Sequence, residues 1–172
     1  MAKKIVNTII GSLGSLISIP FMKEIIVFLI SMSPILELRG GLIAASLFNM
    51  NPIESYIICV IGNIIPIPFI LWLITKILNY MRSSKIKKLN SIAQWLDKKV
   101  EKHKGQIEKY GYLGVVLFVG IPLPGTGAWT GCLVASVLEL DKKKSFLAAL
   151  LGVFIASIIM MILSFGILSK VI

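Results

Sequence analysis

The sequence predicts an all-α integral membrane protein with two inverted repeats, each a re-entrant helical hairpin plus a transmembrane helix. Three observations predict this fold. The chain has 172 residues, of which 56% are hydrophobic and only 15% charged, whereas a soluble domain is about 45–50% apolar and about 25% charged. Its hydrophobic stretches have two lengths, short and membrane-spanning, and their breaks recur ninety residues later. The composition excludes a soluble enzyme, a disordered tail and a disulfide scaffold.

We expect residues 1–172 to form one membrane domain that begins with a transmembrane helix over 5–20. Lys3 and Lys4 precede an apolar run from Ile5 to Pro20. This start could be a signal peptide, but it lacks a small-residue cleavage signature. We therefore interpret it as a retained membrane helix.

A first re-entrant hairpin is predicted over residues 24–48. A spanning helix needs about 20 apolar residues, but the run from Ile25 to Leu36 has twelve. It contains Pro34 and leads directly into Glu37-Leu38-Arg39-Gly40-Gly41, after which the apolar run to Phe48 is again short. Two half-length helices around such a break are typical of a hairpin that enters and leaves on one side, shielded by protein or a wet cavity.

Full-length spans are predicted over 53–75 and 145–169, and a second hairpin over 113–138. Pro66 and Pro68 predict a kink in the first span. A shift of ninety residues superposes the two halves without a gap, and it aligns Phe28 with Phe118, Pro34 with Pro124, Gly41 with Gly131, Ser55 with Ser145 and Gly62 with Gly152. Because breakers, small residues and polar loops fall in register together, the pattern predicts an internal repeat.

The basic residues predict the orientation. The formal net charge is +10, and ten of the 18 Lys and Arg residues lie within 76–109. Since cytoplasmic loops are rich in Lys and Arg, we place the N-terminus and residues 76–110 in the cytoplasm, in a multi-pass protein of a prokaryotic plasma membrane. The two halves are then inverted. No nucleic-acid partner is expected, because no base-reading module accompanies the charge.

The connector over 76–110 is predicted to be a basic amphipathic helix with Trp95 at its boundary. Its apolar positions recur at three- and four-residue spacing, at Leu89, Ile92, Leu96, Val100, His103, Ile107 and Tyr110. Such a helix lies on the inner leaflet or packs on the transmembrane core. Membrane lipids are therefore expected partners.

Enzymatic chemistry has little support in the sequence. Cys59 and Cys132 lie in apolar stretches and are expected to be free thiols. His103 lies between Lys102 and Lys104, which favours a solvated position. We see no nucleophile–base pair and no cluster at metal-ligand spacing, and we predict no enzyme activity, no metal and no cofactor.

Glu37 and Arg39 are the strongest functional candidates, because a charge at membrane depth costs about 2.5 kcal/mol or more. In one interpretation Arg39 binds an anionic group, preferably a phosphate, with its planar fork, while Glu37 takes up and releases a proton. In the other, the two form a structural ion pair that steadies the hairpin tip.

The break of the second hairpin is the matching candidate. A half-helix N-terminus there would favour an anion, although a tight turn packed in protein explains the stretch equally well. Asn63, in the first span, is a further polar candidate, or else makes an interhelical hydrogen bond. The candidate substrate- and proton-binding residues are Pro34, Glu37, Arg39, Gly40, Gly41, Asn63, Pro122, Pro124, Gly125, Thr126, Gly127, Trp129 and Thr130.

Two motifs resemble the small multidrug export family of bacteria and archaea. They are Ser33-Pro34-Ile35-Leu36-Glu37-Leu38-Arg39-Gly40 and Gly120-Ile121-Pro122-Leu123-Pro124-Gly125-Thr126-Gly127-Ala128-Trp129-Thr130-Gly131. The resemblance covers roughly residues 25–170. It implies that Glu37 and Arg39 match the family's Glu-Leu-Arg motif and that residues 122–131 match its second motif.

That family is similar in plan to the DedA/VTT superfamily, whose members are implicated in moving polyprenyl-phosphate and phospholipid carriers. This chain departs from the two patterns at two places. Leu42-Ile43 stands where the family often has an Ile-Pro step, and the second hairpin lacks the arginines typical of DedA proteins.

We expect a small, proton-linked transporter that works as a homodimer, because so short a chain can hardly enclose a pathway alone. Its substrate would be a small amphipathic compound for export, or an anionic lipid such as undecaprenyl phosphate. A buried arginine favours the anion, whereas an exporter of cationic drugs should use acidic and aromatic residues without it. The alternative is a non-transporting membrane scaffold or assembly factor.

Overall fold

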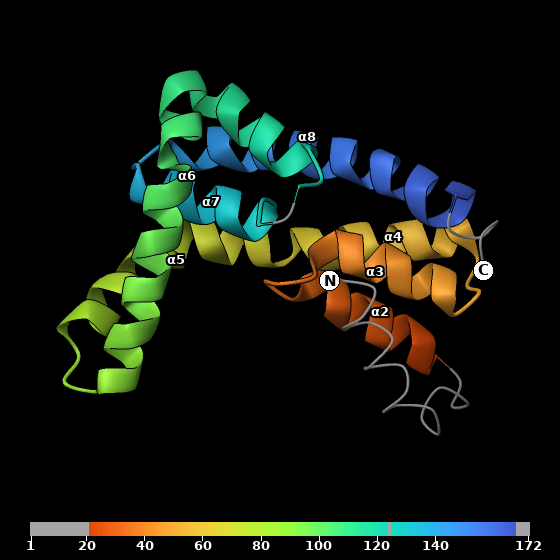
Figure 1. The fold of residues 1–172 in the computed structure, drawn as a ribbon, viewed down its shortest axis with the longest axis horizontal. Coiled ribbons are helices and arrows are strands. Elements are labelled where there is room, and N and C mark those ends of the chain that lie inside the picture. Colours follow the sequence, from red (N-terminus) through yellow and green to blue (C-terminus); the bar gives the residue numbers. More distant parts are fainter. Residues whose placement is uncertain (1–20, 124, 168–172) are drawn as a thin grey trace. The chain divides into compact units, whose positions relative to one another are not determined.

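The computed structural model describes residues 21–123 and 125–167, and every regular element in this part of the chain is a helix (Figure 1). The predicted helix over 5–20 and Pro124 lie outside the described residues. The elements are α2 (Met22–Met32), α3 (Glu37–Leu47), α4 (Pro52–Ile64), α5 (Pro66–Ser83), α6 (Lys87–Gly120), α7 (Ala128–Val137), α8 (Lys142–Met161) and the π-helix η1 (Ile162–Ile167).

Two helical stretches, Pro52–Ser83 and Lys142–Gly166, are long and apolar enough to cross a membrane. The first is interrupted at Ile65, between α4 and α5. Pro66 explains the interruption, since proline lacks the backbone N–H of a helix interior but fits the first helical position. Helix α5 then continues to Ser83, beyond the expected end of the span at residue 75, so it includes the start of the predicted connector.

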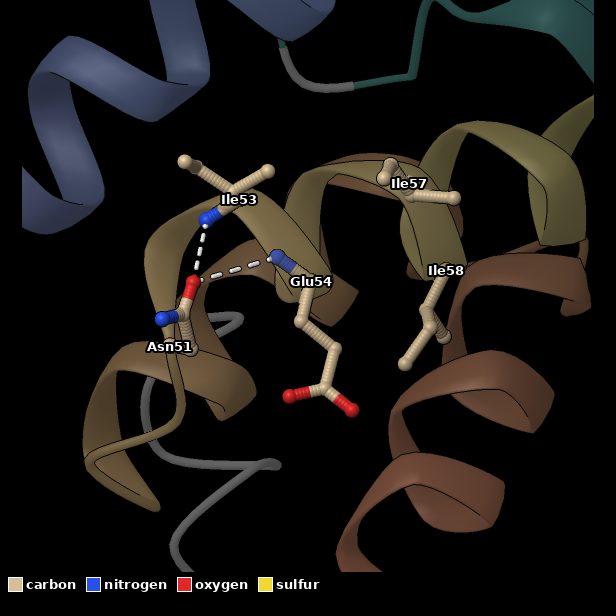
Figure 2. A pocket seen from close by; sticks show the side chains of 5 residues that line it. All are labelled: Asn51, Ile53, Glu54, Ile57 and Ile58. Carbon is tan, nitrogen blue, oxygen red and sulfur yellow. Dashed lines mark hydrogen bonds between the residues drawn. The ribbon is translucent and has the colours of Figure 1, made fainter.

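The starts of α4 and α8 are capped in the same way, ninety residues apart. The side-chain oxygen of Asn51 accepts hydrogen bonds from the backbone N–H groups of Ile53 at 2.9 Å and Glu54 at 3.4 Å (Figure 2). The Oδ1 atom of Asp141 accepts from the N–H group of Lys144 at 2.9 Å. Asn and Asp are favoured at this position because they satisfy N–H groups that have no partner within the helix.

The ends of α3 and α7 also match. Asn49 and Glu139 both adopt a left-handed conformation, with φ of 52° and 55°. The N–H group of the residue after each reaches back five positions, from Met50 to Ala45 O at 3.1 Å and from Leu140 to Ala135 O at 3.0 Å. Both helices therefore end in a Schellman motif, and the ninety-residue offset found in the sequence recurs in local structure.

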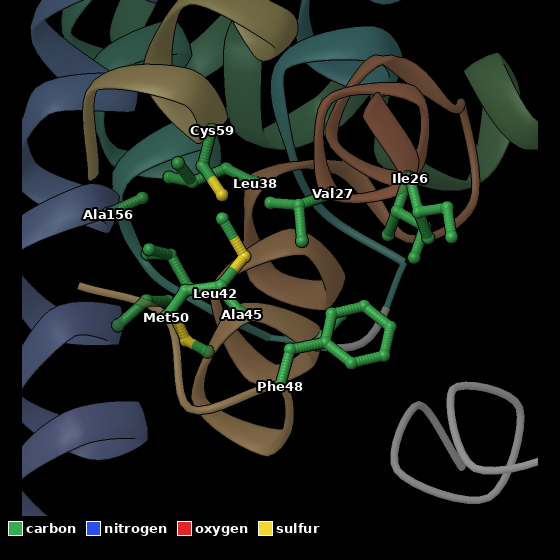
Figure 3. Close-up of a cluster of buried hydrophobic side chains, with 12 residues drawn as sticks. Ile26, Val27, Leu38, Leu42, Ala45, Phe48, Met50, Cys59 and Ala156 are labelled. Carbon is green, nitrogen blue, oxygen red and sulfur yellow. The ribbon is translucent and has the colours of Figure 1, made fainter. Parts of the chain in front are cut away.

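The chain divides into two compact units, and α8 contributes to both. The first unit comprises residues 1–65 and 153–172. In it α2 packs against α3 and α4, and α3 also contacts η1. Its buried core, part of which Figure 3 labels, consists of Ile26, Val27, Ile30, Leu38, Leu42, Ala44, Ala45, Phe48, Met50, Cys59, Ala156 and Met160.

The second unit, residues 66–152, holds α5, α6, α7 and the start of α8. Here α7 packs against both α5 and α6, and α5 also pairs with α6. Helix α6 is bent at Gly111, whose φ of 57° and ψ of −130° interrupt the helix and favour glycine. The bend gives α6 a first arm, residues 87–110, and a second arm, residues 112–120.

The first arm packs through a narrower face than its apolar pattern predicts. Ala93, Val100 and Ile107, seven residues apart, are buried. Ile92 and Tyr110, which we expected on the same face, are 48% and 52% exposed. Both side chains therefore stay available to the inner leaflet, which is the other position that we expect for this helix.

His103 is half-buried rather than solvated, and its ring meets the Phe118 ring edge-on, with the centroids 5.1 Å apart. Desolvation, with the charges of Lys102 and Lys99, lowers the pKa of His103 below 6.5. Between the lowered pKa and 6.5 the unfolded chain binds more protons, so stability rises with pH across this window. The contribution is complete above 6.5 and is lost as the pH falls through the lowered pKa.

We therefore expect the thermal midpoint in detergent to rise modestly between about pH 5 and about pH 7.5, and the His103→Gln variant to show a smaller rise. An unchanged pH dependence in His103→Gln would assign the effect to other groups.

Candidate functional site

The turn between α2 and α3 is held together by Ser33. Its hydroxyl donates to Ile30 O at 2.8 Å and accepts from the N–H group of Leu36 at 3.3 Å. Pro34 lies exposed in this turn. The serine thus closes the end of α2 and sets the position at which α3 begins.

Glu37 is the first residue of α3, and its backbone is strained. Its φ is 52°, in a region that residues with a side chain adopt at a cost of about 1–3 kcal/mol. The side chain is only 5% exposed, and the backbone N–H group donates to Ser33 O at 3.2 Å. A buried carboxylate on a strained backbone is costly for folding, and such features cluster at functional positions.

Arg39 follows in the first turn of α3 and is half-buried. The carboxylate of Glu37 is the charged group that acts on its guanidinium. Gly40 and Gly41 come next and are buried. The absence of a side chain at Gly40 leaves room for its neighbours, since a Cβ atom there would crowd Leu36 and Ile30.

Asn63 lies in the same unit, one helical turn after Cys59 on α4. It is 2% exposed, and its Oδ1 atom has no hydrogen-bond partner among the described residues. A buried amide oxygen without a partner costs about 1–3 kcal/mol. Asn63 is therefore a polar group in an apolar span that can accept a hydrogen bond.

The residues from the second motif lie in the other unit, so each group is described by itself. Gly125 and Gly127 have φ of 86° and 142°, which explains why glycine stands at both positions. The Thr126 hydroxyl lies 3.0 Å from Ile121 O and 2.9 Å from Leu123 O. These contacts close the turn, and the predicted role of Thr126 in substrate binding stays a prediction.

The remaining residues of that motif flank the start of α7. Pro122 and Trp129 are half-buried, whereas Thr130 is buried. Cys132 and Cys59 are both buried, and neither forms a disulfide bond in the described part of the chain.

The sequence did not single out several serines of the first unit, of which Ser31 and Ser164 are buried and Ser46 is half-buried. Ser31 donates to Val27 O at 2.8 Å, and Ser46 donates to Ser164 O in η1 at 2.8 Å. The Ser164 hydroxyl oxygen is buried without a partner in the described residues. Small hydroxyl residues in apolar runs are common at membrane helix contacts, which was the available signal.

A separate pocket lies at the start of α4, lined by Asn51, Ile53, Glu54, Ile57 and Ile58 (Figure 2). None of the predicted site residues lines it. Within residues 21–123 and 125–167, no group of three or more His, Cys, Asp or Glu side chains is placed to hold a metal ion.

Comparisons with known proteins give one match. No curated protein and no solved structure is similar enough to be matched. A family profile for small multi-drug export proteins matches residues 37–159. The match begins at Glu37 and includes Arg39, Asn63 and the whole second motif. Together with the two apolar stretches, it indicates a membrane protein with a transporter-type role, and the chain belongs to the small multi-drug export protein family.

Proposed function

We propose that this chain transports a substrate with an anionic group across the membrane, and that Arg39 holds this group while Glu37 takes up and releases a proton. One observation carries the proposal. Glu37 is the only Asp, Glu, Lys or Arg side chain that is buried in the described part of the chain. An ionisable group at such a position in a membrane protein is functional by default, because it is costly to place there.

The charges of the Glu37 carboxylate and the Arg39 guanidinium support these two separate roles. A buried carboxylate is stable when it is protonated or paired with a cation, so the Glu37 carboxylate and a substrate anion compete for the guanidinium of Arg39. Binding of an anion to Arg39 would reduce its attraction to Glu37 and favour proton uptake by the carboxylate. Proton binding and substrate binding are thereby coupled.

We further infer that the halves are inverted repeats with re-entrant hairpins. Each unit holds one hairpin, the first part of the apolar stretch that follows it, and the last part of the other apolar stretch. Matched helix ends at a ninety-residue offset support the same interpretation. Inverted repeats with broken helices are a recurrent plan of secondary transporters. A homodimer in a prokaryotic plasma membrane, with residues 76–110 cytoplasmic, completes the proposal.

A phosphate is the anion that suits Arg39 best, since the planar guanidinium can bind two phosphate oxygens at once. The phosphate could belong to a lipid, as the DedA-like plan would suggest, or to a small amphipathic compound. A polyprenyl phosphate and a short-chain alkyl phosphate distinguish these sources.

The test is ligand-induced thermal stabilisation of the purified protein in detergent. A ligand that binds only the folded state adds about 2.7 kcal/mol of stability at 100 times its Kd. We expect polyprenyl phosphate to raise the midpoint of the wild type and of Arg82→Gln, but not of Arg39→Gln. Arg82→Gln is the matched control, because it removes an exposed arginine whose pair with Asp97 contributes little.

Proton coupling is tested by transport in proteoliposomes with and without a pH gradient. Glu37→Gln should bind the phosphate but lose the gradient dependence. Stabilisation by lipophilic cations that depends on Glu37 alone would overturn the anion assignment. If none of these ligands raises the thermal midpoint, and Glu37→Gln and Arg39→Gln are only less stable than the wild type, the result would favour a non-transporting membrane scaffold.

A further inference from the structure

We propose that one exposed stripe of the first arm of α6 docks on the anionic phospholipid headgroups of the membrane. The basic stripe comprises Lys88, Ile92, Trp95, Lys99, Lys102 and Lys109. Its spacing of three, four or seven residues places all six on one side of the helix. This surface lies outside the predicted substrate site, and its role is independent of what the protein exports.

The apolar members of the basic stripe are unusually exposed. Trp95 is 58% and Ile92 48% exposed, while the neighbouring face with Ala93 and Val100 is buried in the unit. The Nζ atom of Lys99 lies 5.3 Å from the centre of the Trp95 ring. A tryptophan flanked by lysines is typical of the membrane interface, where the ring enters the headgroup layer and the ammonium groups stay in water.

The acidic residues of this arm lie away from the basic stripe. Asp97 pairs with Arg82 of α5, and Glu101 pairs with Lys104 at 2.7 Å. Glu108 follows Glu101 by seven residues and therefore lies on the same side as Glu101. The stripe thus presents only positive charge, which is complementary to anionic lipid.

The direction of the arm is consistent with this position. Within the second unit, Figure 1 shows the first arm of α6 crossing the direction of α7 and of the start of α8, instead of running along them. The start of α8 belongs to a stretch able to span the membrane. If α8 runs across the bilayer, the arm runs along its surface, where lipid headgroups can meet the whole stripe.

The experiment measures how closely lipid approaches Trp95 in the reconstituted full-length protein. Trp72→Phe and Trp129→Phe leave Trp95 as the sole tryptophan. This variant is reconstituted into two kinds of phosphatidylcholine vesicle, one with and one without phosphatidylglycerol. Both kinds contain the same amount of phosphatidylcholine that is brominated near the headgroup. The brominated lipid quenches tryptophan fluorescence on contact. We expect stronger quenching with phosphatidylglycerol, and a loss of the difference at high salt, because exposed charges are screened over about 3 Å at 1 M.

Two pairs of charge-neutralising substitutions locate the interaction. Lys99→Gln with Lys102→Gln should remove the effect of phosphatidylglycerol, whereas Lys87→Gln with Lys104→Gln, on other faces of the same arm, should retain it. If the sole-tryptophan protein fails to fold, the quenching lost in Trp95→Phe from the otherwise native chain gives the same quantity.

Equal quenching in both vesicles would overturn the proposal, and so would equal effects of the two pairs. If Trp95 is quenched in neither kind of vesicle, the proposal is also overturned, and an acidic protein becomes the expected partner of this surface.

Discussion

Replacing Gly41 with alanine is expected to lower the free energy of unfolding by about 1–3 kcal/mol. A methyl group at this position would overlap Ser31 Oγ and lie 2.9 Å from Cys59 Sγ. Neither neighbour can easily give way, because the Ser31 hydroxyl is fixed by its hydrogen bond to Val27 O and the Cys59 side chain is fully buried. The measurement is the unfolding transition of the purified protein in mixed micelles.

Two further variants separate overlap from a general effect of alanine. Gly105→Ala makes the same chemical change in α6, where nothing lies within 4 Å of the added group, so we expect no loss and up to about 1 kcal/mol of gain from helix propensity. Ser31→Ala combined with Gly41→Ala should recover part of the loss. If Gly41→Ala is as stable as Gly105→Ala, α3 does not approach α2 and α4 as described.

Gly152→Ala is expected to cost a similar amount in the other unit. A Cβ atom there would lie 2.6 Å from Val119 Cβ and 2.9 Å from the carbonyl oxygen of Val116. The backbone carbonyl cannot rotate away, so the second arm of α6 would have to move off α8. A loss of about 1–3 kcal/mol in the same unfolding assay would follow.

Gly166→Ala is the matched control for this position, since it adds the same methyl group to the same apolar stretch. Its added group would be 3.9 Å from Ile162, an ordinary contact distance. Equal losses in Gly152→Ala and Gly166→Ala would argue against the close approach at Gly152.

Most helix positions could be predicted from the sequence, because apolar length and proline placement act locally. The break at Ile65 follows from Pro66, and the turn after α2 follows from Pro34. Gly111 lies between the expected end of the connector at 110 and the expected start of the second hairpin at 113. That the two parts join in one bent helix was not predicted, because no local pattern specifies the backbone geometry at this glycine. The pairing of α5 with α6 was missed for a similar reason, since it depends on contacts between distant residues.

The residue types of the candidate site could be predicted from the sequence, but the burial and the backbone conformation of Glu37 could not. That Glu37 and Arg39 stand out follows from charge within an apolar chain. The burial of Glu37 and its positive φ depend on how α2 meets α3, which composition does not encode. The contacts of the Thr126 hydroxyl with the carbonyl oxygens of Ile121 and Leu123 likewise depend on the shape of the turn, which residue type alone does not specify.

The division of α8 between the two units has a consequence for biosynthesis. Ala156 and Met160 belong to the same buried core as Cys59 and the hairpin residues before it. At a translation rate of about 5–20 residues per second, they emerge from the ribosome roughly 5–20 s after Cys59. During that interval the nascent first hairpin lacks one side of its core. We therefore expect the membrane insertion machinery to shelter an unfinished helix surface until Ala156 and Met160 have been made.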